Sequence, residues 1–187
     1  MSQSIRARLR GRFTGPVLVP GIDGHTDDYN DECRSLNPAV DARPAAIVLA
    51  QNAQEVRAAL ETARRFDLPF AVQATGHGTH VGNDGGLLVK TGAMARVLVD
   101  PDRRLASVGP GARWADVLKA ASPLGLAPLS GSSPSVGVTG YTLGGGMGWL
   151  ARRYGLAAVR PGDRRDPTDH RGRSIQCGDP ALGRRHR

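Results

Sequence analysis

The chain has 187 residues, enough for one domain of usual size with a hydrophobic core, or for a domain and a tail. Its net charge of +8 comes from the two ends, because residues 1–12 carry four arginines and no acid, residues 159–187 carry eight arginines against four aspartates, and the stretch between them is neutral. A nucleic-acid-binding domain usually spreads its basic residues over the folded surface, so this distribution argues against DNA or RNA as a partner.

The first part of the chain is an Arg-rich segment, residues 1–14, followed by a turn-rich stretch with little periodicity. We expect irregular structure up to residue 43, with one short helix around Asp27–Ser35. The main domain is expected to begin at about residue 15.

The central part alternates between strand and helix signals. Ala45–Leu49 is a short apolar run after a proline, which predicts a buried strand. Asn52 with Glu55 three residues later predicts a capping box at the start of a helix, and the apolar spacing extends this helix to about Phe66–Leu68. Phe70–Ala74 predicts a second strand.

Four further elements follow before the chain changes character. Leu87–Lys90 predicts a third strand, and Val97–Asp100 with Leu105–Val108 predicts a hairpin around the turn between them. Trp114–Ala121 has apolar residues at helical spacing and predicts an amphipathic helix.

Two glycine-rich segments carry the strongest local signals. Thr75–Gly78 follows the predicted strand 70–74, and residues 131–148 hold seven glycines in eighteen positions. Glycine at that density is costly in backbone entropy, and it is usually needed where backbone approaches another group closely or adopts a positive φ. Two such loops can offer backbone N–H groups to the pyrophosphate of a dinucleotide. From the residues alone, two surface turns remain an equal alternative.

Other motifs fail. A Rossmann G-x-G-x-x-G pattern has Trp149 in place of its third glycine, and a P-loop fails because Val89 precedes Lys90. A G-x-S-x-G nucleophile elbow fails as well. His77 and His80 have no recognisable third metal ligand, so we predict no metal site.

The remaining exclusions concern compartment and membrane. Cys33 and Cys177 are too few for a disulfide framework or a Cys-based zinc site. No apolar run approaches the roughly 20 residues that span a bilayer, and the basic start lacks the apolar stretch of a signal peptide. These features favour a cytoplasmic protein without a membrane partner.

The order of the motifs is specific. The motifs are R-P-x-x-I (Arg43–Ile47), T-G-H-G (Thr75–Gly78), V-D-P (Val99–Pro101), V-G-P-G-A (Val108–Ala112), the glycine-rich run (131–148) and R-R-Y-G-L-A-A (152–158). Together, from about Gly15 to Ala158, they resemble the FAD-linked oxidases of the berberine-bridge-enzyme group, within the wider vanillyl-alcohol-oxidase/p-cresol-methylhydroxylase family. The resemblance implies an incomplete, two-subdomain p-cresol-methylhydroxylase-type FAD-binding domain of α+β class, with mixed sheets and flanking helices.

The resemblance also implies the site. His77 matches the histidine that bonds covalently to the flavin 8α-methyl carbon in that family, with a noncovalent role in the loop as the alternative, and we assign no role to His80. Ser133 stands where many relatives carry a second, cysteine attachment, and a hydroxyl is a poorer nucleophile than a thiolate, so at most one covalent bond is expected. Tyr141 and Thr142 lie between the glycines of the run 131–148 as plausible flavin contacts, and both are expected to serve packing rather than chemistry. The implied FAD-binding residues are Gln73, Ala74, Thr75, Gly76, His77, Gly78, Gly131, Ser133, Val136, Gly137, Gly140, Thr142, Gly144, Gly145, Gly146 and Gly148.

The resemblance stops at Ala158. Residues 159–187 are rich in Arg, Asp, Pro and Gly, lack periodicity and have few large apolar groups, which predicts a disordered basic tail. Because such sequence can arise when a GC-rich gene is read in the wrong frame, we hypothesise a frameshifted or truncated product. A natural regulatory or partner-binding tail is the alternative.

The sequence leaves two functions open. The family implies an oxidoreductase that takes a hydride from a small organic substrate onto flavin N5, with oxygen as acceptor. The alternative is a noncatalytic remnant that binds FAD weakly or not at all, which we favour for the isolated polypeptide because no residue can be nominated as catalytic base.

Overall fold

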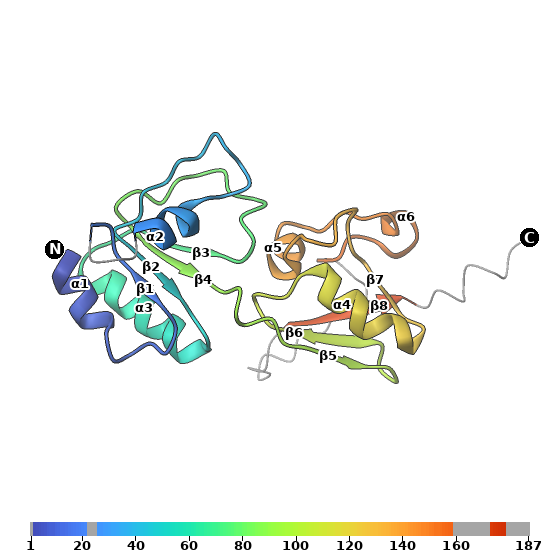
Figure 1. Cartoon of the computed structure of the whole chain (residues 1–187). Coiled ribbons are helices and arrows are strands. Elements are labelled where there is room, and N and C mark those ends of the chain that lie inside the picture. Colours follow the sequence, from blue (N-terminus) through green and yellow to red (C-terminus); the bar gives the residue numbers. More distant parts are fainter. Residues whose placement is uncertain (1, 22–25, 159–172, 179–187) are drawn as a thin grey trace, which may run out of the picture. The chain divides into compact units, whose positions relative to one another are not determined.

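The computed structural model describes residues 2–21, 26–158 and 173–178, and the chain divides into two compact units, Met1–Met94 and Ala95–Arg187. Each unit has its own sheet (Figure 1). Each unit also has its own hydrophobic core. Within the part of the chain that the structure describes, no helix is long and apolar enough to cross a membrane.

The first unit is built on a four-stranded sheet. Its strands are β1 (Val17–Leu18), β2 (Ala46–Leu49), β3 (Phe70–Gln73) and β4 (Leu87–Lys90), in the spatial order β1-β2-β4-β3. β4 pairs in parallel with β2 and with β3, and the short β1 runs antiparallel to β2 at the edge. The strands predicted at 45–49, 70–74 and 87–90 are therefore confirmed.

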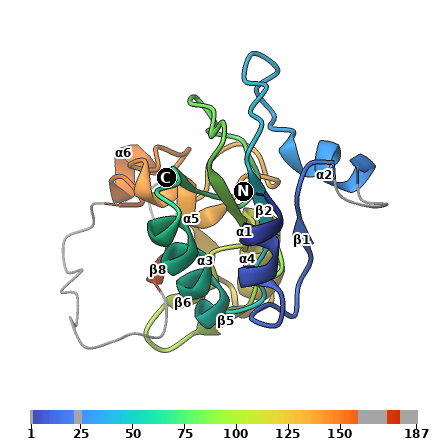
Figure 2. The ribbon, with the colours of Figure 1, turned by 90° about the vertical axis from the view of Figure 1, so that its left-hand side faces the viewer.

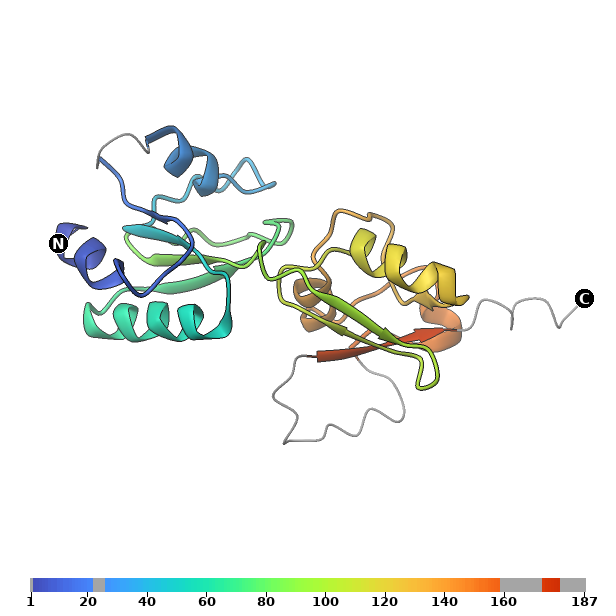
Figure 3. The same cartoon turned by 60° about the horizontal axis from the view of Figure 1, so that its bottom comes forward.

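Helices cover both faces of this sheet. The helices are α1 (Ser2–Leu9), α2 (Thr26–Cys33) and α3 (Ala53–Arg65). Because side chains alternate along a strand, Ala46 and Val48 of β2 pack with α1 and α3, whereas Ile47 packs with α2 on the opposite face. Figure 2 shows α1 beside α3, and Figure 3 shows the sheet lying between α2 and α3.

The first helix is the main difference from the sequence prediction in this unit. The helix expected around 27–35 is confirmed as α2, but α1 lies in the segment whose only sequence signal is its arginine content. Ile5 and Leu9, one helical turn apart, are both fully buried in the core of the first unit. Two apolar residues among arginines give little periodic signal, so packing against α3 and β2 decides this helix.

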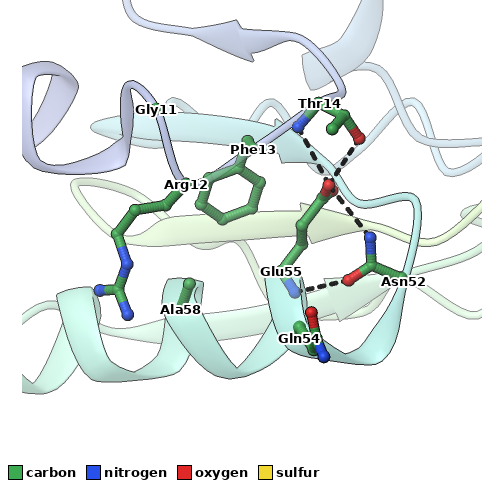
Figure 4. Close-up of a pocket in the computed structure, with 8 residues that line it drawn as sticks. All are labelled: Gly11, Arg12, Phe13, Thr14, Asn52, Gln54, Glu55 and Ala58. Carbon is green, nitrogen blue, oxygen red and sulfur yellow. Dashed lines mark hydrogen bonds between the residues drawn. The ribbon is translucent and has the colours of Figure 1, made fainter.

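Asn52 caps α3, as predicted, and its side chain makes one half of the expected capping box, whereas the Glu55 carboxylate accepts from the backbone of Gln51. The Glu55 N–H donates to Asn52 Oδ1 over 3.0 Å. Glu55 as a residue is only 3% exposed, and its carboxylate also accepts from the N–H and the hydroxyl of Thr14 at 3.0 and 2.7 Å, and from the N–H of Gln51 at 2.8 Å. Thr14, Asn52 and Glu55 line a pocket of about 340 Å³ between the segment Gly11–Thr14 and the start of α3, and Figure 4 shows the hydrogen bonds among these three residues. One carboxylate thus ties the chain after α1 to the helix.

We expect Glu55→Gln to lower the free energy of unfolding by about 1–3 kcal/mol at neutral pH, because the buried amide cannot accept all of these hydrogen bonds. Burial raises the pKa of Glu55, but the hydrogen bonds from Thr14, Gln51 and Asn52 outweigh it and hold the pKa below its usual range. The carboxylate therefore stabilises the fold above its unfolded pKa, and this contribution is lost as the pH falls through the lower, folded pKa.

Urea unfolding of wild type and Glu55→Gln across the acid range measures this contribution. The difference between the two proteins should shrink as the pH falls. Glu61→Gln serves as the control, because Glu61 is an exposed partner of Arg12 and its removal should change little. A difference between wild type and Glu55→Gln that stays constant with pH would contradict the assignment.

The second unit is an antiparallel sheet. Its strands are β5 (Val97–Asp100), β6 (Leu105–Val108), β7 (Ala127–Pro128) and β8 (Arg173–Gly178), in the order β5-β6-β8-β7. The predicted hairpin is confirmed as β5 and β6, with Val97 opposite Val108. Trp114, the first residue of the helix that follows β6, is fully buried in the core of this unit.

The helices of this unit are α4 (Trp114–Ala121), the 3₁₀ turn η1 (Ser122–Leu124), α5 (Val138–Leu143) and α6 (Ala151–Tyr154). The predicted amphipathic helix is confirmed as α4, whose apolar side packs on Ala106 and Val108 of β6. α5 was not predicted, because glycine-rich sequence is a poor helix former.

The strand β8 differs from the prediction for the C-terminal segment. Residues 173–178 lie in the stretch that we expected to be disordered, yet they pair antiparallel with β6 and β7. Backbone hydrogen bonds to two strand edges do not require an apolar sequence pattern, so composition does not reveal such a strand. Residues 159–172 and 179–187 lie outside the described residues.

Candidate functional site

The first candidate segment is the loop that follows β3. Gln73 at the end of β3 stands opposite Lys90 at the end of β4, so both lie at the carboxyl edge of the parallel strands. Ligands of open α/β sheets bind outside this edge, because the loops there are free to vary while the strands hold them in place. The loop that carries His77 leaves the sheet at this edge.

His77 is exposed, and its Nδ1 lies 2.8 Å from the hydroxyl of Thr75. The glycines beside it differ in role. Gly76 has a φ of +76°, so its backbone conformation favours glycine. A Cβ there would also lie 2.9 Å from Gln73 Nε2, so the end of that side chain would have to shift. Around Gly78 no atom lies within 4 Å of the position of a Cβ, so another molecule can approach the backbone there. The result is an accessible imidazole, a nucleophile, on a tightly constrained turn.

The side chain of the half-buried Gln73 is hydrogen-bonded to other side chains of the protein. It contacts Lys90 Nζ at 2.6 Å and the Thr79 hydroxyl at 3.1 Å. Gln73 was predicted from the sequence as a cofactor contact, whereas Lys90 and Thr79 were missed. The signal that points to Lys90 is its position at the end of a parallel strand beside β3, which requires knowledge of the sheet order.

The second candidate segment is the glycine-rich run 131–148, in which three glycines pack around one aromatic ring. A Cβ on Gly131 would lie 3.0 Å from Tyr141 Cε2, and one on Gly146 would lie 2.8 Å from Tyr141 Cε1. A Cβ on Gly148 would collide with the carbonyl oxygen of Ser130 and lie 2.9 Å from the Tyr141 hydroxyl. These glycines are required by packing within the unit.

Other glycines of the run face open space. No atom lies within 4 Å of a Cβ built on Gly140 or on Gly145, and Gly145 has a φ of +104°. Gly137 precedes α5 as its N-cap, and Gly144 follows α5 as its C-cap. Backbone of this run is therefore open to a ligand at Gly140 and Gly145.

The remaining predicted site residues of the run have mixed roles. Val136 packs against the core of the second unit, so its side chain contributes to stability. The hydroxyls of Ser133 and Ser135 lie 2.9 Å apart near the surface.

The two candidate segments lie in different units. Residues 73–78 belong to the first unit and residues 131–148 to the second.

Three buried polar atoms of the second unit, two of them in this segment, lack hydrogen-bond partners. Among the described residues, the Trp114 Nε1, the Tyr141 hydroxyl and the Thr142 hydroxyl are buried with no partner. The rings of Trp114 and Tyr141 meet edge to face, with centroids 5.3 Å apart. Burial raises the pKa of Tyr141. Since buried polar groups in proteins are nearly always hydrogen-bonded, the Thr142 hydroxyl offers bonding capacity to a ligand.

No metal centre emerges from the geometry. Across residues 2–21, 26–158 and 173–178, no three His, Cys, Asp or Glu side chains gather closely enough to hold a metal ion. The chemistry available in the candidate segments is that of an exposed imidazole, open glycine backbone and a buried hydroxyl.

The sequence is similar to those of curated FAD-linked oxidoreductases. The chain is 32% identical over 148 residues to the uncharacterized FAD-linked oxidoreductase YvdP of Bacillus subtilis, covering 78% of this chain and 32% of that protein. It is 37% identical over 160 residues to the FAD-linked oxidoreductase hasG of Aspergillus fumigatus, covering 84% of this chain and 34% of that protein. The chain thus spans about a third of the length of these curated relatives.

Solved structures show the same fold. The 6-hydroxy-D-nicotine oxidase of Arthrobacter nicotinovorans superposes with a TM-score of 0.70 at 29% identity, over 77% of this chain and 31% of that one. The BBE-like 1 protein of Physcomitrella patens superposes with a TM-score of 0.72 at 23% identity, over 81% and 33%, which speaks for the fold alone. The expected α+β fold with mixed sheets and flanking helices is confirmed.

The family follows from the sequence match that accompanies this fold. Residues 44–159 match the model of the family described as FAD binding domain, and this range includes the His77 loop and the whole glycine-rich run. Because the match covers more than half of the chain, the protein belongs to the FAD-binding domain family of the FAD-linked oxidoreductases.

Proposed function

We propose that this chain binds FAD through the His77 loop and the glycine-rich run 131–148, and that it serves a flavin-dependent oxidoreductase acting on a small organic substrate. The observation that carries this proposal is an accessible imidazole on a tightly constrained loop, at the carboxyl edge of a parallel sheet, in a chain of the FAD-binding domain family. Bound FAD supplies an acceptor for a hydride from the substrate, and oxygen is the proposed final acceptor.

The residues of the first unit fit such a cofactor. The open space at Gly78 lets a flat ring system approach the backbone next to His77. Gly76 adopts a positive φ that a residue with a Cβ rarely adopts, so glycine allows the loop to make this turn. An anion such as a diphosphate is well accommodated by a glycine-rich turn after a strand, where backbone N–H groups are accessible.

The residues of the second unit also fit. FAD carries ribityl hydroxyls, a diphosphate and ring nitrogens, all of which pair with hydroxyl donors. The buried Thr142 hydroxyl, unpartnered among the described residues, is suited to such a group. The open backbone at Gly140 and Gly145 allows close approach by the cofactor.

We further propose that His77 forms a covalent bond to the 8α carbon of the flavin. The imidazole nitrogen loses its N–H hydrogen and the 8α-methyl group loses one hydrogen as the C–N bond forms. Molecular oxygen takes both hydrogens and leaves as hydrogen peroxide, so atoms and electrons balance. His77 suits this role because it is exposed and its neighbour Gly78 leaves space for the ring.

A second candidate function is a noncatalytic protein that holds FAD weakly or not at all. The chain matches about a third of the length of its relatives, and no described residue can be nominated as a catalytic base. FAD binding by this chain therefore does not imply turnover of a substrate. A cytoplasmic location and the absence of nucleic-acid and membrane partners stay predictions.

Titration of the purified, flavin-free protein with FAD tests the proposal. We expect quenching of flavin fluorescence with micromolar or tighter affinity and a yellow protein after removal of free FAD. A matched variant is Thr142→Val, which removes the buried hydroxyl and keeps the shape. It should weaken FAD binding about tenfold, yet leave stability unchanged or higher, because an unsatisfied buried hydroxyl is lost. A colourless protein with no thermal shift in excess FAD would favour the second candidate.

A further inference from the structure

A chain of hydrogen bonds joins β4 to the loop that carries His77. Lys90 Nζ donates to Gln73 Oε1 over 2.6 Å, and Gln73 Nε2 donates to the Thr79 hydroxyl over 3.1 Å. The Thr79 hydroxyl in turn donates to the Gly76 carbonyl over 3.2 Å. We call these three side chains, Lys90, Gln73 and Thr79, the loop relay.

The relay has a direction that the lysine imposes. A lysine ammonium can only donate, so Gln73 must turn its carbonyl oxygen towards Lys90 and its NH₂ group towards Thr79. The Thr79 oxygen then accepts from Gln73, and its own hydrogen goes to Gly76. Each bond polarises the next, so a single charge at the sheet edge orients the whole chain of bonds.

The relay and its neighbours hold the turn at both ends. The Gly76 carbonyl also accepts from the Leu36 N–H over 3.4 Å, and the Thr79 carbonyl accepts from Asn37 Nδ2 over 3.0 Å. His77 and Gly78 lie between these two anchored residues. The imidazole is therefore exposed on a turn whose ends are anchored to β4 and to the segment after α2.

Lys90 acts here as an anchor. Its Nζ lies 3.2 Å from Glu32 Oε2 of α2, and its side chain is 14% exposed. The ion pair with Glu32 and the hydrogen bond to Gln73 together use the charge of Lys90 inside the protein. Lys90 is thus better suited to orient Gln73 than to bind a phosphate directly.

We infer that Lys90, Gln73 and Thr79 are positioning residues that hold His77 in the orientation needed for flavin attachment. This inference rests on the proposed function, and it changes the role of Gln73 from a cofactor contact to a support of the loop. Attachment requires the imidazole and the 8α carbon to meet in a defined geometry, and a misplacement of about 1 Å can slow such a step by about 100-fold.

Gln73→Glu tests the direction of the relay. The carboxylate can still accept from Lys90, but it cannot donate to Thr79. The Thr79 hydroxyl would instead turn its one hydrogen to the carboxylate, so the Gly76 carbonyl loses its hydrogen bond while the side-chain volume stays the same. We expect covalent incorporation of added FAD to slow by about 10- to 100-fold. In the flavin-free protein, hydrogen exchange of the amides at 75–80 should become faster while the melting temperature changes little.

A matched pair at Thr79 separates positioning from a general loss of structure. Thr79→Ser keeps the hydroxyl and should behave like wild type in both measurements. Thr79→Val keeps the shape but loses the hydroxyl, and it should resemble Gln73→Glu. Rescue by serine alone is a result that a packing role for Thr79 would not produce.

The outcomes separate the two proposals. If wild type takes up no covalent FAD, the proposed attachment fails, and the exchange data from the flavin-free variants decide whether the relay holds the loop. If wild type is flavinylated and either Gln73→Glu or Thr79→Val keeps the wild-type attachment rate, the positioning role is overturned. Unchanged exchange at 75–80 in both variants overturns it as well.

Discussion

Replacing His77 by alanine is expected to abolish covalent FAD attachment while the protein stays folded. The side chain is exposed, so its removal should change the free energy of unfolding by no more than about 0.5 kcal/mol. After incubation with FAD and acid precipitation, wild type should keep yellow colour in the pellet and gain the mass of one flavin adduct. His77→Ala should lose both signals and still quench flavin fluorescence reversibly.

His80→Ala is the matched control for this experiment. It lies three residues further on and is also exposed, but we assign it no role. It should be flavinylated like wild type. An adduct that persists in His77→Ala, or that disappears in His80→Ala, would refute His77 as the attachment site.

Replacing Gly148 by alanine is expected to cause the largest loss of stability of any glycine in the run 131–148. The new Cβ would collide with the Ser130 carbonyl oxygen and lie 2.9 Å from the Tyr141 hydroxyl. Relief requires movement of backbone or of the ring that packs on the buried Trp114. We therefore expect a loss of about 3 kcal/mol, at the upper end for overpacked sites, measured by urea unfolding.

Gly140→Ala is the control, because it is the same substitution in the same run. No atom lies within 4 Å of its Cβ, and Gly140 lies inside α5, where alanine is the better helix former. We expect this variant to gain up to about 1 kcal/mol of stability. If FAD approaches Gly140 as proposed, the same variant should bind FAD more weakly. Equal stability of the two variants would contradict a packing role for Gly148.

Glycine content by itself does not distinguish these two roles. From the sequence, all glycines of the run were assigned to the cofactor. In the structure, Gly131, Gly146 and Gly148 make room for Tyr141, whereas Gly140 and Gly145 leave backbone open. The expectation that Tyr141 serves packing agrees with its edge-to-face contact with Trp114.

Local patterns in the sequence determined most of the secondary structure. The apolar runs of β2 and β4, the Asn52–Glu55 cap of α3, the β5–β6 hairpin and the amphipathic α4 each carry their signal within a few residues. The motif order also identified the family and placed the histidine on the loop after β3. These features depend on neighbours in the chain, so sequence periodicity and capping residues suffice to find them.

Only the tertiary structure decided the features that depend on distant residues. α1 is held by packing of Ile5 and Leu9, and β8 by backbone pairing with β6. Gln73 and Lys90 are seventeen positions apart and meet because parallel pairing places both strand ends at one edge. Their hydrogen bond, and the anchoring of the turn around His77, arise from the register of the sheet, which no local stretch of sequence contains.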